Sequence, residues 1–185
     1  MKRMFMCTTL LFAATAMLAQ APNEDHHAMA SPKETASTTI GGTGVTIDYN
    51  SPRVRGRQGH IFTKDGLISH DQDYPYWRAG ANTATTMKTS GDIHIGSLNV
   101  PAGTYTLFVD IGNPDQWTLV LSKKTGEWGL NYDKTQDLGR VKMTMSNPTA
   151  LVEDLKYSFK QEGAKKAMMT LSWENKSASV PIEAQ

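Results

Sequence analysis

Residues 93–121 read IHIGSLNVPAGTYTLFVDIGNPDQWTLVL, and this stretch decides the fold class. Two short alternations of apolar and polar residues, 93–95 and 98–100, flank the pair Gly96-Ser97. A glycine-first pair between two such runs is typical of a two-residue β-hairpin, because glycine adopts the positive φ that the turn needs. The stretch is therefore predicted to begin with a hairpin.

Turn residues then recur at short intervals. Pro101-Ala102-Gly103 precedes an expected strand over 104–111, and Asn113-Pro114-Asp115 precedes a second strand. We expect Gly103 to close its turn with a positive φ. In the second strand, one face carries every other residue, as in a β-strand: Trp117, Leu119 and Leu121.

The same alternation extends outward from this stretch in both directions. Upstream it covers Val45 to Tyr49, and downstream it recurs around Met143, Tyr157, Leu171 and Ile182. Short strands with turn residues between them are typical of a sandwich or barrel, and no stretch has a long helical period. The prediction is an all-β fold, an antiparallel, jelly-roll-like β-sandwich of roughly eight to ten strands. It forms a single domain over residues 40–185.

The first 21 residues have the three parts of a signal peptide. Lys2 and Arg3 form a basic head, 4–18 is apolar and uncharged, and Ala19-Gln20-Ala21 places small residues at a cleavage site. The apolar run is shorter than the ~20 residues of a membrane span. We therefore expect a cleavable signal peptide, a periplasmic or extracellular protein, and no transmembrane segment in the mature chain.

The composition argues against several classes of protein. The only cysteine, Cys7, lies in the expected signal, so we expect no disulfide and no thiolate metal ligand in the mature chain. The 19 basic and 18 acidic residues are nearly balanced, which argues against a nucleic-acid binder. No phosphate-binding or dinucleotide-binding glycine motif occurs, so no cofactor is expected. Residues 22–39 are polar, and we expect a disordered linker there.

Residues 51–86 interrupt the alternation and are rich in Arg, His, Asp and aromatic residues. Long irregular segments carry function more often than the strands that support them, so we expect the binding site here. Arg53, Arg55 and Arg57 share a face on an extended chain, and Arg78 follows. Arginine grips a carboxylate or phosphate through two parallel hydrogen bonds, which suggests an anionic ligand.

The alternative role of these arginines is structural. Arg53 and Arg78 would then pair with internal carboxylates and brace the segment against the sandwich, since ion pairs often produce such clusters. Arg78 in particular is expected to be buried against the sandwich, with Asp92 or Asp48 as partner. Both interpretations stay open.

Aromatic residues in the same segment suggest a saccharide. Trp77 and Asn82 flank Gly80, and an aromatic face with amide hydrogen bonds is what a sugar-binding groove uses. Alternatively Trp77 fills the core, as large aromatic residues usually do. Trp117, Trp128 and Trp173 look like core residues by their alternation. For an unknown small ligand, either an anion or a saccharide, the candidate contacts are Arg53, Arg57, Trp77, Arg78 and Asn82.

Several motifs are similar to those of a known family. They are SPR at 51–53, Arg57 with Ile61-Phe62, WRAGAN at 77–82, PAGTYTLF at 101–108 and EWG at 127–129. The chain resembles the secreted bacterial family called domain of unknown function 2911, from about Val45 to Ile182. The resemblance implies export in a bacterium and a compact β fold. It implies no activity, because the family has no accepted one.

Two other functions stay open beside a ligand-binding module. A hydrolase of saccharide or another envelope substrate would use Asp71, Asp73 or His60. A structural envelope protein would need no small ligand. No metal site is expected, because neither an HExxH nor an HxH spacing occurs. Two facing carboxylates, or a histidine against a carboxylate, would favour the enzyme.

Overall fold

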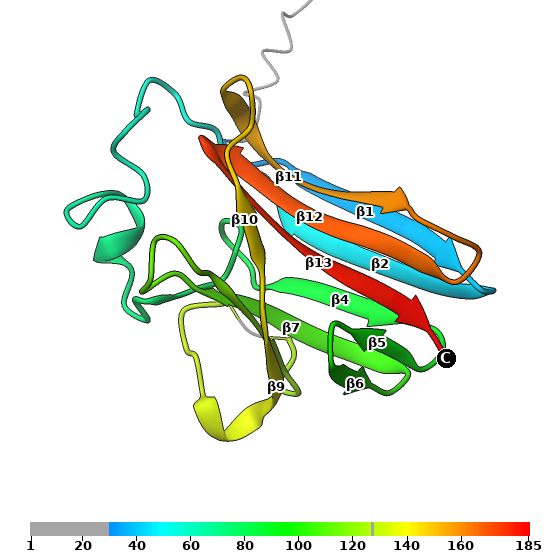
Figure 1. Cartoon of the computed structure of the whole chain (residues 1–185). Helices are drawn as coiled ribbons and strands as arrows, with labels where there is room; N and C mark the ends of the chain where they lie inside the picture. The colour runs from blue at the N-terminus through cyan, green and yellow to red at the C-terminus, as the bar shows by residue number, and fades with distance from the viewer. Residues whose placement is uncertain (1–29, 127) are drawn as a thin grey trace, which may run out of the picture.

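The computed structural model describes residues 30–126 and 128–185. Within them, a seven-stranded and a six-stranded antiparallel sheet face each other, which confirms the predicted fold class (Figure 1). The described strands are more numerous than expected because four of them have only two or three residues. The expected signal peptide and residues 22–29 lie outside the described residues.

The strands of the larger sheet lie side by side in nearly the order in which they occur along the chain. Its strands lie in the order β1 (Lys33–Ile40), β2 (Thr43–Asn50), β4 (Thr85–Thr89), β7 (Gly103–Asp110), β8 (Thr118–Ser122) and β9 (Asp137–Lys142). The two-residue strand β3 (Tyr76–Trp77) also pairs with β7, through Tyr76 opposite Asp110.

The smaller sheet is built mainly from the C-terminal third of the chain. Its order is β11 (Val152–Gln161), β12 (Lys166–Glu174), β13 (Lys176–Ala184), β5 (Ile93–Ile95) and β6 (Leu98–Val100), and β10 (Thr144–Ser146) also pairs with β13. Two short 3-10 turns complete the described elements, η1 (Ile68–His70) and η2 (Lys134–Gln136). No helix of the described residues is long and apolar enough to span a membrane.

Alternation along the strands fills the space between the sheets. One face of each long strand contributes fully buried side chains, such as Ile47 of β2, Leu107 of β7 and Leu119 of β8. Leu155 of β11 and Met169 of β12 meet them from the other sheet in the same buried cluster. The opposite faces of β2, β4 and β7 point away from this core, and their residues form the outer face of the larger sheet.

The expectation of a linker over 22–39 is wrong for residues 33–39. Lys33–Ile40 is strand β1, which pairs with β2 over its whole length. Most of its side chains are exposed and only Ile40 is buried, so its composition resembles a linker. An edge strand obtains its order from the backbone hydrogen bonds of its neighbour, which a count of apolar residues does not detect. Gln161 of β11 also donates hydrogen bonds to Thr38 and Thr39.

The predicted hairpin is confirmed, and the predicted conformation of Gly103 is wrong. Ile95 pairs with Leu98 across Gly96-Ser97, and Gly96 has a φ of +55°. Gly103 is the first residue of β7, lies opposite Thr89, and is not among the glycines with positive φ. A side chain there would approach the ring of Tyr105, whose hydroxyl would lie 3.3 Å from the added Cβ.

Candidate functional site

Residues 51–75 extend beyond the two sheets at one end of the sandwich, where they form the cyan-to-teal loop of Figure 1. The start of the segment docks on β11 as a short extension of the smaller sheet. Val54 N donates to Glu153 O at 2.9 Å, and Leu155 N donates to Pro52 O at 2.9 Å. Arg53 lies opposite Asp154 in this bridge. The loop therefore begins from a fixed position.

Three predicted arginines meet at one surface cleft of about 430 Å³, which we call the arginine cleft. The sequence predicted that Arg53, Arg55 and Arg57 share a face of an extended chain; they do line one cleft, but the chain turns at 54–57, where Arg57 N donates to Val54 O at 3.0 Å. The rest of the cleft is neutral, and its described lining residues are Ala30, Ser31, Pro52, Leu67 and Ala81. A cleft of this size and lining is comparable to sites that hold small ligands.

The three guanidinium groups are held in different ways. Arg53 Nε contacts Asp154 Oδ1 at 2.7 Å in an exposed ion pair. Arg57 donates from Nε to Val54 O at 3.0 Å and from Nη2 to Arg53 O at 2.6 Å. Arg55 has an exposed side chain for which the described residues supply no carboxylate within 4.0 Å, although its backbone N donates to Glu153 Oε1 at 2.9 Å.

The backbone of Arg55 is in the left-handed region, with a φ of +49°. A residue other than glycine rarely adopts this conformation, and it costs of order 1–3 kcal/mol unless the surroundings hold it. The hydrogen bond from Arg55 N to Glu153 supplies one such restraint. The geometry therefore keeps the Arg55 side chain exposed at the cleft.

Trp77, predicted as a candidate ligand contact, lies in the core and is only 1% exposed. Its ring stacks on Trp173 with centroids 5.9 Å apart and meets Phe62 edge-on at 5.5 Å. It cannot offer a face to a surface ligand, so the role that remains is support of the loop. The core interpretation that the sequence left open for Trp77 is the one that the structure shows.

Arg78 and Asn82 lie together and do not line the arginine cleft. Arg78 Nη1 donates to the carbonyl oxygen of Asn82 at 3.1 Å, and Asn82 has a φ of +56°. Arg78 is half-buried, and its Nε is buried without a hydrogen-bond partner among the described residues. The four predicted polar contacts thus divide into two groups on the same segment.

The expected carboxylate partners of Arg78 are wrong. Asp92 accepts a hydrogen bond from Ala102 N at 2.8 Å, and Asp48 accepts one from Thr35 Oγ1 at 2.6 Å. The carboxylate whose charge interacts with Arg78 is Asp71. Asp48 does lie at an exposed position of β2, but Asp92 precedes β5 and lies outside the strands, and sequence alternation does not indicate which loop lies against either residue.

The acidic candidates for hydrolysis have separate surroundings. Burial raises the pKa of Asp71, while the charge of Arg78 opposes this shift and that of Asp73 adds to it. Asp73 Oδ2 accepts a hydrogen bond from Tyr132 N at 2.8 Å. His60 is exposed, and no hydrogen bond or ion pair links it to either carboxylate within the described chain. No group of three His, Cys, Asp or Glu side chains there is placed to hold a metal ion.

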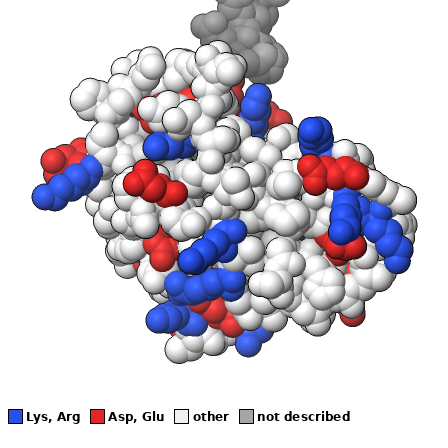
Figure 2. All heavy atoms as spheres, in the orientation of Figure 1, with Lys and Arg blue, Asp and Glu red and all other residues white. Residues whose placement is uncertain are grey.

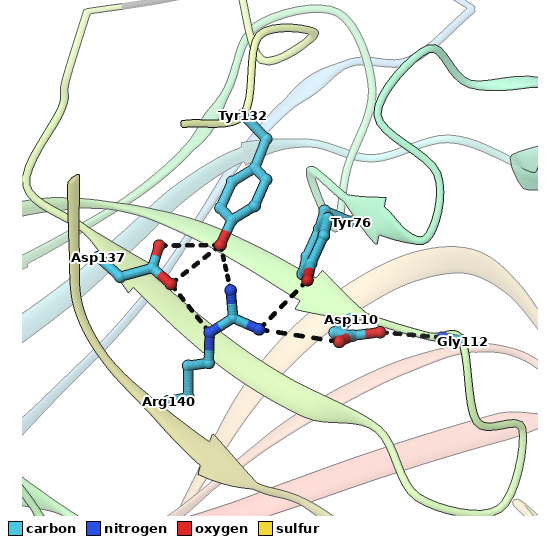
Figure 3. Close-up of polar contacts among 6 residues, drawn as sticks. All are labelled: Tyr76, Asp110, Gly112, Tyr132, Asp137 and Arg140. Atoms are coloured by element: carbon cyan, nitrogen blue, oxygen red, sulfur yellow. Dashed lines mark hydrogen bonds and ion pairs between the residues drawn. The ribbon is translucent and has the colours of Figure 1, made fainter. Parts of the chain in front are cut away.

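A polar cluster that the sequence did not predict lies on the outer face of the larger sheet (Figure 3). Arg140 of β9 is at its centre, with Nε 2.9 Å from Asp137 Oδ2 and Nη1 3.9 Å from Asp110 Oδ2. Its guanidinium carbon lies 5.1 Å from the ring centre of Tyr76, a cation–π distance. We call these residues, with Tyr132, the Arg140 cluster.

Tyr132 connects this cluster to the loop between β8 and β9. Its ring stacks on Tyr76 with centroids 4.1 Å apart, and its hydroxyl donates to Asp137 at 2.9 Å and accepts from Arg140. Burial raises the pKa of Tyr132, and the hydrogen bond and charge of Asp137 raise it further. The members come from four separate segments, so no sequence spacing indicated that they meet.

Charges of both signs are interspersed over the face drawn in Figure 2, with no extended field of one sign. This agrees with the formal net charge of +1 for the whole chain. Recognition of an anion therefore depends on local arginines and not on the overall charge.

Comparison with known proteins identifies a family and nothing more specific. A family model described as "Protein of unknown function (DUF2911)" matches residues 31–182. No curated protein and no solved structure matches the chain at a significant level.

Proposed function

The chain belongs to the DUF2911 family of proteins of unknown function, and we propose that it is an exported module that binds a small anion in the arginine cleft. The observation that carries the proposal is the convergence of Arg53, Arg55 and Arg57 on one cleft of about 430 Å³. Export rests on the signal-like first 21 residues, and it remains a prediction.

Donor capacity supports an anionic ligand. A guanidinium has five N–H donors, and the described contacts use one on Arg53 and two on Arg57. The donors of Arg55 have no described partner at all. A carboxylate or phosphate can accept two parallel hydrogen bonds from one such group, and charge-assisted bonds of this kind are worth about 1.5–3 kcal/mol each.

The ion pair of Arg53 does not remove its binding capacity. Its side chain is 42% exposed and that of Asp154 is 55% exposed. An exposed pair contributes only about 0–1 kcal/mol to stability, so water or a ligand competes with it readily. The Arg57 side chain is fixed by two carbonyl oxygens and forms a rigid wall of the cleft. We therefore expect Arg55 and Arg53 to contact the ligand and Arg57 to position them.

Isothermal titration calorimetry of residues 22–185 tests this proposal with galacturonate, citrate and inorganic phosphate. We expect one of them to bind with a stoichiometry of one. Arg55→Gln should weaken binding at least about tenfold, the loss of one charge-assisted interaction. Lys160→Gln is the matched control, because it removes one positive charge from an exposed position of β11.

Two outcomes would overturn the proposal. The first is that none of the three anions binds. The second is that Lys160→Gln weakens binding as much as Arg55→Gln, which would mean that net charge and not the cleft attracts the anion.

A further inference from the structure

A second surface depression, of about 460 Å³, lies on the outer face of the larger sheet and shares no lining residue with the arginine cleft. Its floor crosses three strands in register: Thr35 of β1 lies opposite Asp48 of β2, which lies opposite Thr86 of β4. Gly126, from the loop between β8 and β9, also lines the depression. We call this depression the outer groove.

The polar groups of the outer groove are oriented by one another. Asp48 Oδ1 accepts from Thr35 Oγ1 at 2.6 Å, and Asn50 Oδ1 accepts from Thr83 Oγ1 at 2.9 Å. Asn50 Nδ2 donates to Ser31 O at 3.1 Å, which fixes the amide orientation. Hydroxyl, amide and carboxylate groups together supply donors and acceptors at close spacing, which suits a ligand with many hydroxyl groups.

The charge of the lining disfavours an anionic ligand. Lys33 is the described cation of the lining, and Glu34 and Asp48 are its anions. The arginine cleft, in contrast, is lined by three cations and no carboxylate. The two depressions therefore suit different ligand chemistries.

The chain segment that carries an exposed indole borders the outer groove. Trp128 is 62% exposed, more than any other large apolar side chain of the described chain, although the sequence predicted a core residue. Gly126 lines the groove, and Gly129 packs so closely on Ala84, another lining residue, that an added Cβ would lie 2.9 Å from Ala84 Cα. The chain on both sides of Trp128 therefore contacts the groove wall.

The Arg140 cluster fixes this part of the loop to the sheet. Tyr132 lies four residues after Trp128 in the same loop. Its ring stacks on Tyr76, its backbone N donates to Asp73, and its hydroxyl contacts Arg140 and Asp137 (Figure 3). Its members contact no groove lining residue through any described bond. They act as positioning residues for the loop that carries Trp128.

We propose that the outer groove binds a neutral oligosaccharide, with a sugar ring stacked on Trp128 and its hydroxyl groups on Asp48 and Thr86. An aromatic side chain offers an apolar face that packs against the C–H face of a sugar. Fixed polar groups beside the ring then determine which hydroxyl pattern fits. The lining of this site contains no residue of the arginine cleft, so the proposal does not rest on the anion proposed for that cleft.

Tryptophan fluorescence provides a selective readout of this site. The chain has four tryptophans, and Trp77, Trp117 and Trp173 are each at most 2% exposed. Acrylamide should therefore quench mainly Trp128. Hexasaccharides of glucose, mannose, xylose and N-acetylglucosamine are the probes, and at least one should protect Trp128 from acrylamide in a saturable way.

Variants distinguish a groove site from unspecific protection. Trp128→Ala should weaken binding of the protecting hexasaccharide at least about tenfold by calorimetry. Thr86→Val should also weaken it, because this change removes a hydroxyl from the groove floor and leaves the indole intact. Leu151→Ala, at an apolar side chain that is 44% exposed on a different segment, is the control and should bind as the parent does.

The proposal is overturned if no hexasaccharide protects Trp128, or if Trp128→Ala binds as tightly as the parent. It is also overturned if Arg55→Gln abolishes the protection, since saccharide binding would then occur at the arginine cleft. Failure of the anion proposal leaves this result unaffected, because Arg55 does not line the outer groove.

Discussion

At Gly129 the backbone adopts a conformation that only glycine tolerates easily. Its φ is +87°, and an added Cβ would lie 2.9 Å from Ala84 Cα and 3.0 Å from Ala84 N. Backbone atoms cannot move aside as a flexible side chain can. Gly129→Ala should therefore lower the free energy of unfolding by about 3 kcal/mol, from strain and overlap together.

Gly126→Ala is the matched control for this prediction. Gly126 has a similar φ of +80°, but nothing lies within 4 Å of the added Cβ. Its cost should be about 1 kcal/mol, the backbone contribution alone. Urea unfolding of both variants measures the difference. Equal costs would mean that Gly129 is not packed on Ala84.

Asp71 is expected to make stability depend on pH. Burial raises its pKa above the ordinary value of 3.8, against the opposing charge of Arg78. The folded protein holds this proton to a higher pH than the unfolded chain does, so stability falls as the pH rises through the interval between the two pKa values. The carboxylate thus destabilises the folded state at neutral pH.

Asp71→Asn should consequently unfold at a higher urea concentration than the parent at neutral pH. The two proteins should become equally stable as the pH falls below 3.8, where both forms are neutral. A variant that is less stable than the parent at neutral pH would show that the charge of Asp71 is needed by Arg78 and that burial is the smaller effect.

The positions of some side chains could be predicted from the sequence, and those of others could not. Arg53, Arg55 and Arg57 were predicted to share a face of an extended chain. They do line one cleft, but a turn at 54–57 with a positive φ at Arg55 brings them there, and alternation does not predict that turn. The alternation of residues could not show that Trp77 is buried and Trp128 exposed. Trp77 enters the core because β3 pairs with β7, whereas Trp128 lies in a loop with glycine at 126 and 129.

At the scale of elements, β1 is the longest of the described strands that the sequence did not predict. It contributes Ile40 to the core and pairs with all eight residues of β2. A chain that begins at Gly41 should lose more than about 3 kcal/mol of unfolding free energy, because a buried isoleucine and a complete strand are removed.

A chain that begins at residue 30 is the control for this truncation. Residues 22–29 are polar, and their removal should leave the melting temperature nearly unchanged. Circular dichroism melting of both truncated chains checks the prediction. Equal melting temperatures for the chains beginning at residues 30 and 41 would contradict the assignment of β1 as part of the sandwich.

The hairpin between β5 and β6 and the β1 strand show why sequence reasoning succeeded in one place and failed in another. Gly96 is a local signal, since its positive φ is needed by a two-residue turn and nothing distant contributes. β1 depends on its partner strand for order, and its exposed polar residues carry no local signal. The Arg140 cluster likewise depends on the register of β3, β7 and β9, which no local pattern encodes.

For the whole molecule, both sheets contribute to one buried cluster of side chains. Neither sheet can lose its partner without exposing this cluster, so the domain should unfold in one cooperative transition. Tryptophan fluorescence, which reports mainly on the core, and circular dichroism, which reports on the strands, should give the same urea midpoint. Separate midpoints would contradict a shared core.

The central claim is that Arg53 and Arg55 recognise an anion at the arginine cleft. Two-dimensional NMR of the arginine Nε–H groups tests it most directly, during titration of residues 22–185 with galacturonate, citrate or phosphate. We expect the signals of Arg55 and Arg53 to shift with one common binding curve, while those of Arg78 and Arg140 stay in place. Arginine signals that do not move with any of the three anions, or a shift confined to Arg78, would contradict the claim.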